Sequence, residues 1–269
     1  MPRDLEGRIA FVTGSGRGLG NLMAQRLAAR GADVVVHDLN WDASAKYGEA
    51  ANLGEAAEKI AALGVRSLAV TGNIGDREAV ATMRADIEAG LGEVDILVNC
   101  AGGDIGASGN KPDPNNILGI TYEDLITLTN NNLIGTMLVT QAFVPQMVKK
   151  KSGVVVNIGS AAAHAGYSHG GIYATLKAAV VHYTRCLADE VRKHGVRVNA
   201  VSPGPTKTAR FQATRTVDPA WMDSSGTNLD RYAEPGEIAD AVAFLCGPEA
   251  KFIHGQVLRV DGGLTLFPG

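Results

Sequence analysis

The sequence predicts an α/β protein with a Rossmann-type, doubly wound parallel sheet of about seven strands and helices on both faces. Short apolar runs rich in β-branched residues alternate with stretches of helical periodicity through all 269 residues. Helices that separate consecutive strands force right-handed parallel crossovers. Because no linker, repeat or low-complexity stretch divides the chain, we expect residues 1–269 to form a single domain.

The first apolar run, Ile9–Val12, is followed by four glycines within residues 14–20. Helical spacing of apolar residues then continues up to Gly31, which gives the order strand, glycine turn, helix. Such a turn lets a pyrophosphate approach the backbone, and the helix N-terminus offers it unpaired N–H groups. A glycine turn without a ligand is the alternative, but the flanking elements favour a dinucleotide site. The cofactor contacts expected here are Gly14, Ser15, Arg17, Gly18, Leu19 and Gly20.

An acidic residue, Asp38, ends the next apolar run, Asp33–Asp38, roughly 20 residues beyond the glycines. A carboxylate at this place accepts hydrogen bonds from the adenosine ribose and repels a 2′-phosphate, so it favours NAD over NADP. Arg17 argues for NADP, because an arginine in the glycine turn can pair with that phosphate. We give the carboxylate more weight, since bringing a phosphate against it costs a like-charge contact whereas Arg17 can turn to solvent.

Composition excludes several other classes of protein. The net charge is −3 without a basic block, which gives nucleic-acid binding no electrostatic support. No apolar run approaches membrane-spanning length, and the N-terminus lacks a signal-peptide core. The three cysteines have no C-x-x-C spacing, so we expect a reduced cytoplasmic protein without disulfides or a metal site.

The remaining elements bring several polar residues to one edge of the sheet. In parallel sheets ligands bind beyond the carboxyl ends of the strands, where Asp38, Asn73, Asn99, Ser160 and Pro203 are expected. A long Gly/Asn/Pro loop at 104–119 and a polar segment at 205–234 are expected beside this edge, the second as a substrate lid. Further strands are predicted at 67–74, 95–100, 153–160, 196–201 and 256–263, and helices at 55–63, 76–89, 122–147, 171–193 and 234–246.

A tyrosine and a lysine lie four residues apart, at Tyr173 and Lys177, on one face of the helix that follows the strand ending at Ser160. Alone, this spacing usually marks a surface pair, but its place beside a central strand end favours chemistry. Hydride transfer from an alcohol requires removal of the hydroxyl proton, and free tyrosine, with a pKa near 10, is a poor base at neutral pH. We expect the Lys177 ammonium and a cationic nicotinamide to lower the Tyr173 pKa, while Ser160 orients the substrate oxygen.

Together these motifs resemble the short-chain dehydrogenases/reductases over essentially the whole chain. The shared residues are Thr13-Gly14-x-x-x-Gly18-x-Gly20, Asn99-x-Ala101-Gly102, Asn132-Leu, Ser160, Tyr173-x-x-x-Lys177, Pro203-Gly204 and Val260-Asp-Gly-Gly263. The resemblance implies the catalytic group Asn132, Ser160, Tyr173 and Lys177. It also implies cofactor contacts at Asn73, Ile74, Asn99, Ala101, Gly102, Tyr173, Lys177, Pro203, Gly204, Thr206 and Thr208, and commonly a homotetramer.

The function expected from the residues and the resemblance is NAD-dependent hydride transfer between a secondary alcohol and a ketone. An NADP-dependent carbonyl reductase such as a 3-oxoacyl reductase is the alternative, and an NAD-retaining epimerase or dehydratase and a non-catalytic NAD-binding protein are also considered. The polar 205–234 segment and the polar 104–116 loop favour a hydroxylated small molecule such as a sugar or polyol, while keto-acyl and cyclic ketone substrates stay open.

Overall fold

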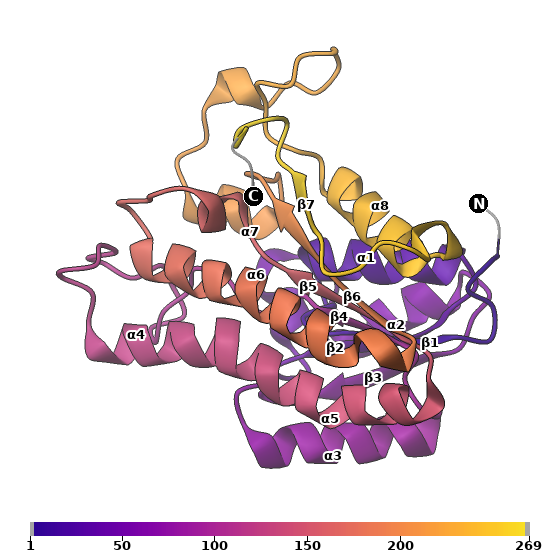
Figure 1. The fold of residues 1–269 in the computed structure, drawn as a ribbon. Coiled ribbons are helices and arrows are strands. Elements are labelled where there is room, and N and C mark those ends of the chain that lie inside the picture. The colour runs from indigo at the N-terminus through magenta and orange to yellow at the C-terminus, as the bar shows by residue number, and fades with distance from the viewer. Residues whose placement is uncertain (1–2, 267–269) are drawn as a thin grey trace.

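The computed structural model describes residues 3–266 and confirms the predicted sheet (Figure 1). The outermost residues of the predicted domain, 1–2 and 267–269, lie outside the described part. All seven strands are parallel, in the spatial order β3-β2-β1-β4-β5-β6-β7. Their bounds are β1 Ile9–Val12, β2 Asp33–Asp38, β3 Ser67–Thr71, β4 Ile96–Asn99, β5 Gly153–Ile158, β6 Val196–Pro203 and β7 Val257–Val260.

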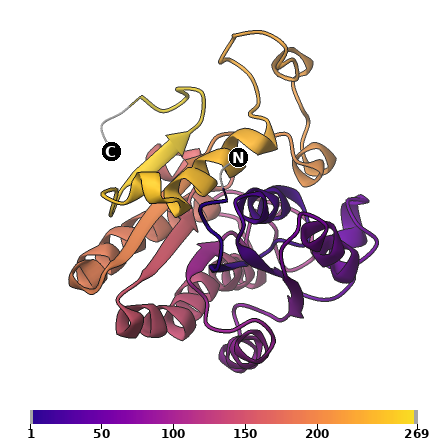
Figure 2. The same cartoon turned by 90° about the vertical axis from the view of Figure 1, so that its right-hand side faces the viewer.

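Helices cover both faces of this sheet, as Figures 1 and 2 show. Helices α1, α2 and α8 pack on one face, and α3, α5 and α6 pack on the other. The bounds are α1 Gly18–Ala29, α2 Leu53–Ala61, α3 Arg77–Gly90, α4 Tyr122–Thr129, α5 Gly135–Lys150, α6 Gly171–Val191, α7 Ala209–Thr214 and α8 Pro235–Cys246.

Alternation along β1 shows how the sequence builds two cores. Ala10 and Val12 face the α1 side, whereas Phe11 faces the α3 side, and all three are fully buried. The ring centroid of Phe11 lies 5.1 Å from that of Phe143 in α5. Since both faces of the sheet are covered, its strands are continuously apolar, and the polar residues gather where the strands end.

Several elements differ from the prediction. The helix expected at 122–147 is α4 and α5 joined by a π-helical turn, Asn130–Ile134. A 3₁₀ turn, Ala43–Tyr47, lies in the stretch after β2, and the short helix α7 lies within 205–234. Without a sustained apolar period, neither segment carries a clear sequence signal for its structure.

The carboxyl ends of the strands form one edge of the sheet, which is called the rim. The polar residues that the sequence predicted at this edge lie at or just beyond the ends of β1 to β6. The 205–234 segment extends above this edge and appears in orange at the top of Figure 1. Between residues 3 and 266, no helix has the length and hydrophobicity needed to cross a membrane.

Candidate active site

The glycine turn after β1 has the geometry of a phosphate-binding turn. Gly14 and Gly18 have φ angles of 67° and 58°, in the left-handed region that favours glycine. A Cβ atom at Gly20 would overlap the Gly14 carbonyl oxygen, so α1 can start here only with a glycine. A Cβ at Gly18 would meet nothing within 4 Å, which leaves open space at the start of α1. This cradle fits a dinucleotide pyrophosphate.

Buried polar side chains hold the turn against neighbouring strands. The Gly14 N–H donates to Nδ1 of His37 at 3.0 Å, and Ser15 Oγ accepts from the His37 N–H at 2.9 Å. Burial lowers the pKa of His37, which keeps its imidazole neutral and its Nδ1 free to accept. Thr13 Oγ1 accepts from the N–H groups of Cys100 and Ala101, both at 3.0 Å, and so joins the turn to the end of β4. His37 and Thr13 had not been predicted as supports of the turn.

Asp38 lies at the end of β2 with its carboxylate toward the glycine turn. A Cβ at Gly16 would lie 2.8 Å from Asp38 Oδ2, so only a glycine leaves room here. Arg17 packs against residues at and beyond the end of β2: its guanidinium carbon lies 4.7 Å from the ring centroid of Tyr47, and its Nε is 3.9 Å from Asp38 Oδ2. Among the described residues, Nη1 of Arg17 and Oγ of Ser44 are buried without hydrogen-bond partners.

A carboxylate from the loop after β2 also contacts the turn. Oε2 of Glu49 accepts from the Gly18 N–H at 2.5 Å, so this side chain stands at the N–H group where a cofactor phosphate is expected. Both residues line a cavity of 380 Å³ that extends to Thr208 and Ala209 at the start of α7. Because the contact joins residues 31 apart in sequence, spacing gave no signal for it.

The predicted reacting group gathers at the end of β5. Lys177 is 4% exposed, and its Nζ donates to the Ile158 carbonyl oxygen at 2.9 Å. The same Nζ lies 5.8 Å from the ring centroid of Tyr173, one helical turn earlier. Ser160 lies two residues beyond β5, where its Oγ accepts from the Ala162 N–H at 3.2 Å, and its side chain also lowers the pKa of Tyr173. Strand β5 and helix α6 therefore bring all three side chains together.

The expected lowering of the Tyr173 pKa needs a cationic nicotinamide as well as Lys177, and it stays a prediction. Burial raises the pKa of Tyr173, and the hydrogen bond with Ser160 opposes that rise. The ammonium donates to a backbone carbonyl instead, and burial lowers the pKa of Lys177 to about 8. Desolvation disfavours both charged forms, a phenolate and an ammonium.

Asn132 lies in the π-helical turn and is fully buried. Its Oδ1 accepts from the Gly103 N–H at 2.9 Å, and its Nδ2 donates to the Gly103 carbonyl oxygen at 3.0 Å. A Cβ at Gly102 would lie 2.6 Å from Asn132 Oδ1, and Gly102 has a φ of 125°. The side chain thus fixes the backbone that follows β4.

The predicted adenosine contacts divide into two groups. Asn99 is 4% exposed, and its Nδ2 donates to Thr140 Oγ1 at 3.2 Å and Asn157 Oδ1 at 2.9 Å. Its side chain therefore lies inside the fold, and only its backbone faces the rim. Asn73 is exposed beyond β3, where its Oδ1 accepts from the Gly75 N–H at 2.9 Å. Its neighbour Ile74 is 7% exposed and belongs to the core.

Beyond β6, the predicted cofactor contacts lie at the base of the 205–234 segment. Pro203 ends β6, and Gly204 passes so close to Asp261 that a Cβ would lie 2.9 Å from its Cα. Thr206 Oγ1 donates to the Gly204 carbonyl oxygen at 2.8 Å, and Thr208 Oγ1 caps α7 by accepting from the Phe211 N–H. Both hydroxyls are therefore engaged locally.

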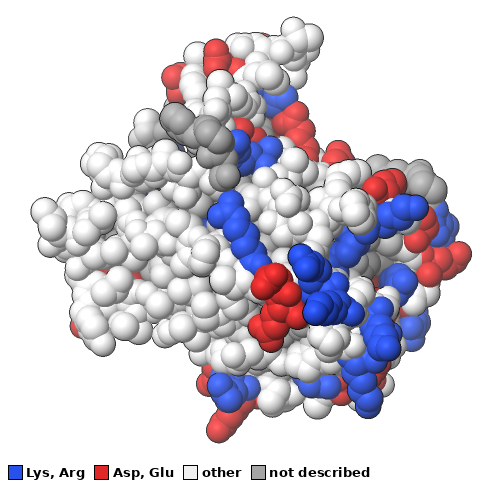
Figure 3. Space-filling model, in the orientation of Figure 1, with Lys and Arg blue, Asp and Glu red and all other residues white. Residues whose placement is uncertain are grey.

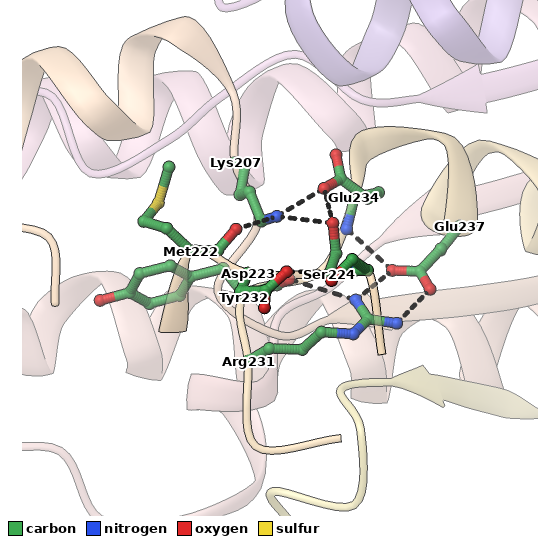
Figure 4. Close-up of polar contacts among 9 residues, drawn as sticks. Lys207, Met222, Asp223, Ser224, Arg231, Tyr232, Glu234 and Glu237 are labelled. Atoms are coloured by element: carbon green, nitrogen blue, oxygen red, sulfur yellow. Dashed lines mark hydrogen bonds and ion pairs between the residues drawn. The ribbon is translucent and has the colours of Figure 1, made fainter. Parts of the chain in front are cut away.

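A polar network joins the two ends of this segment (Figure 4). Nζ of Lys207 donates to the Met222 carbonyl oxygen at 2.7 Å, to Ser224 Oγ at 3.0 Å and to the Glu234 carboxylate. Arg231 pairs with Glu237 in α8, which holds the pKa of Glu237 at about 2. The base of the segment is thus fixed to the start of α8.

Charged residues that the prediction omitted surround Tyr173. Arg210 in α7 donates through Nη1 to the Gly102 carbonyl oxygen at 3.1 Å. Its charge and that of Arg215 lower the pKa of Tyr173, whereas Asp104 raises it. The sequence indicated the effect of Arg210 on Tyr173 only through its position within the predicted lid, residues 205–234. Across residues 3–266, no group of three or more His, Cys, Asp or Glu side chains is placed to hold a metal ion.

Comparisons with known proteins match nearly the whole chain. A family model described as enoyl-(acyl carrier protein) reductase matches residues 14–265. The chain is 34% identical over 272 residues to cyclohexanol dehydrogenase of Rhodococcus sp. (strain TK6), with 97% of each protein covered. It is 33% identical over 263 residues to 3-oxoacyl-(acyl-carrier-protein) reductase FabG of Vibrio harveyi, with 98% of this chain and 99% of the relative covered. A solved 7α-hydroxysteroid dehydrogenase, complexed with NADH and 7-oxo-glycochenodeoxycholic acid, has a TM-score of 0.83 at 31% identity over 97% of this chain and 95% of that chain.

Proposed function

The chain belongs to the short-chain dehydrogenase/reductase family, and we propose that it is an NAD-dependent enzyme that oxidises a secondary alcohol to a ketone or reduces the ketone. The family makes it an oxidoreductase acting on CH–OH groups. The observation that carries the proposal is the meeting of Ser160, Tyr173 and Lys177 at the end of β5, on the rim that also holds the glycine turn.

NAD is the proposed cofactor because Asp38 directs a carboxylate to the place expected for the adenosine ribose. Stacking on Tyr47 and proximity to Asp38 engage Arg17, which would otherwise favour a 2′-phosphate. The similar 7α-hydroxysteroid dehydrogenase was solved with NADH. The backbone N–H of Gly18 would hold the pyrophosphate, and Lys177 would reach the nicotinamide ribose.

Each reacting side chain has a distinct role in the proposed mechanism. Bound NAD supplies the hydride acceptor. Ser160 donates a hydrogen bond to the substrate oxygen and holds it beside Tyr173. The Tyr173 oxygen takes the hydroxyl proton during oxidation and returns it during reduction. Because burial raises its pKa, Tyr173 is protonated at neutral pH in the protein without cofactor, ready to act as the acid in reduction.

The proposed substrate is a hydroxylated small molecule such as a sugar or polyol. Asn115, in the loop after β4, holds Asp104 through Nδ2 at 3.1 and 3.2 Å. The Asn115 Oδ1 is buried, and no hydrogen-bond partner for it lies among residues 3–266. A buried acceptor of this kind suits a substrate hydroxyl, since an unpaired polar group in the fold is costly.

We further propose that residues 1–269 act as one catalytic domain and that 205–234 is its substrate lid. The Lys207 network fixes the two ends of this segment. Within it, the ring centroid of Tyr232 lies 5.1 Å from that of Phe211 and 5.6 Å from that of Trp221. The middle of the segment extends from the rim and can follow a bound substrate.

We also propose that four copies of the chain form a homotetramer and that the protein is located in the cytoplasm. Few charged side chains lie over α4 and the start of α6, at the left of Figure 3, and Tyr122 is 70% exposed there. Phe252, before β7, is 99% exposed. Both regions offer apolar surface to a second copy. The free thiols of Cys100, Cys186 and Cys246 support a reducing compartment.

An NADP-dependent 3-oxoacyl reductase is the second candidate. The similarity to FabG supports it, and so does Arg17, whose buried Nη1 has no hydrogen-bond partner among the described residues and could donate to a 2′-phosphate. The ratio of kcat/KM for NADPH to that for NADH separates the two candidates. A preference for NADPH would favour the second.

The central test is Tyr173→Phe, which keeps the ring and removes the hydroxyl. Turnover of secondary alcohols should fall by about 10²–10⁴, the usual contribution of a positioned acid–base group. NADH binding, followed by its fluorescence, should change little because the glycine turn and Asp38 are untouched. Turnover close to that of the unmodified protein would remove Tyr173 from the mechanism.

A further inference from the structure

An arginine from the 205–234 segment reaches the rim beside the reacting group. Arg210 lies in α7, and its Nη1 donates to the Gly102 carbonyl oxygen at 3.1 Å. A Cβ atom at Gly103 would lie only 2.9 Å from both Nη1 and Nη2, so the guanidinium packs directly on this backbone. The φ of Gly103 is 143°, a conformation that favours glycine and leaves this space to the arginine.

A second arginine from the same segment adds to the positive charge. The guanidinium carbon of Arg215 lies 5.0 Å from the ring centroid of Phe211, and Arg215 is exposed. Both arginines are close enough to the Tyr173 hydroxyl for their charges to act on it. Arg210 also acts on Lys177, whose own ammonium is buried.

No carboxylate of residues 3–266 forms an ion pair with either arginine. Asp104, whose charge raises the pKa of Tyr173, is already paired: Lys111 Nζ lies 3.2 Å from its Oδ2, and Asn115 donates to both of its oxygens. At the rim, the unpaired positive charge therefore lies on α7, whereas Asp104 belongs to a hydrogen-bonded group with Asn115.

From this arrangement we propose that the natural substrate is a hydroxy acid, or the matching oxo acid, whose carboxylate is bound by Arg210 while its carbinol oxygen contacts Ser160 and Tyr173. This inference rests on the proposed function and names its substrate class. A guanidinium pairs with a carboxylate through two parallel N–H donors, which fixes orientation as well as charge. Arg215 supplies a further charge that attracts the acid, and Asn115 Oδ1 can accept from a further hydroxyl, so a polyhydroxy acid matches both groups.

Oxidation rates of matched acids and neutral alcohols test the proposal. The pairs are gluconate with sorbitol, and 3-hydroxybutyrate with 2-butanol, each measured with saturating NAD. The native protein should prefer the acid by about 10–100-fold in kcat/KM, the usual value of a hydrogen bond to a charged group. Arg210→Leu should lose that preference through a higher KM for the acid, with neutral alcohols changed less than about threefold. Arg210→Lys should keep part of the preference for the acid, since it retains the positive charge but not the two parallel N–H donors of a guanidinium.

Arg192→Leu is the matched control, because Arg192 is exposed at the far end of α6. It should leave all four rates unchanged, and NADH binding should be the same in every variant. Equal rates for acids and neutral alcohols in the native protein would refute the inference and leave the proposed function standing. Failure to oxidise any secondary alcohol would refute both.

Two further outcomes would assign Arg210 to another anion. Weaker NAD binding in Arg210→Leu, with the acid preference intact, would place the arginine on a cofactor phosphate. Turnover of 3-hydroxybutyryl-CoA but not of the free acid, lost in Arg210→Leu, would place it on the phosphate of an acyl carrier. Either result would overturn the assignment of a substrate carboxylate.

Discussion

Lys177 combines a proposed catalytic role with a cost to stability, and Lys177→Met should separate the two. The side chain is 4% exposed, and burial lowers its pKa from 10.5 to about 8. At 1.36 kcal/mol for each pH unit, this change corresponds to about 3 kcal/mol by which the fold disfavours the ammonium. Methionine removes that cost but leaves the Ile158 carbonyl oxygen without its donor, which costs about 1–3 kcal/mol.

The sign of the pH dependence follows from the lowered pKa. Below pH 8 the lysine is charged in both the folded and the unfolded protein, and the native fold bears the full cost. Between pH 8 and 10.5 the unfolded chain binds more protons, so the stability of the unmodified protein rises with pH. The free energy of unfolding of Lys177→Met, relative to the unmodified protein, should therefore fall by about 2 kcal/mol between pH 7 and pH 10.

Urea denaturation followed by circular dichroism at pH 7, 8, 9 and 10 measures this difference. Lys149→Met, on the exposed end of α5, is the control and should show no such trend. NADH fluorescence should show weaker binding to Lys177→Met, and alcohol oxidation should be lost. A stability difference that stays constant from pH 7 to pH 10 would show that the Lys177 ammonium is not desolvated as the structure indicates.

Three further predictions concern the cofactor and the assembly. Asp38→Ser should raise kcat/KM for NADP by about tenfold or more relative to NAD, since it removes a like charge from the 2′-phosphate; an unchanged ratio would contradict the role of Asp38. Glu49→Gln should tighten NADH binding by about 2–10-fold, measured by fluorescence titration, because it removes a carboxylate from the Gly18 N–H that a phosphate needs; weaker binding would instead make Glu49 a support of the turn. Light scattering at micromolar concentration should give four times the chain mass of 28.0 kDa, and a monomer mass would exclude the proposed tetramer.

The sheet could be predicted because a short apolar run of neighbouring residues marks each strand in the sequence. The runs at Ile9–Val12 and Asp33–Asp38 have the predicted bounds, and the helix predicted from residue 76 is α3, which Asp76 caps by accepting from the N–H groups of Glu78 and Ala79. Parallel connectivity then follows from the alternation of elements, and with it the convergence of strand ends at one rim.

The contacts that depend on tertiary structure could not be predicted. Glu49 meets Gly18 only because the 3₁₀ turn after β2 folds back over the start of α1. Burial raises the pKa of Tyr173, and a spacing of four residues shows proximity to Lys177 but not burial. The buried place of Asn99 likewise depends on partners from α5 and β5.

The proposed reacting groups and the arginine proposed to bind the substrate lie in different parts of the fold. Ser160 and Lys177 are held by β5 and α6, whose contacts are buried and leave little freedom. Arg210 instead belongs to a segment tied to the fold at its ends, where Lys207 meets Glu234. If Arg210 holds the substrate as proposed, a change in α7 should alter which substrate is held without moving the groups proposed to exchange the proton.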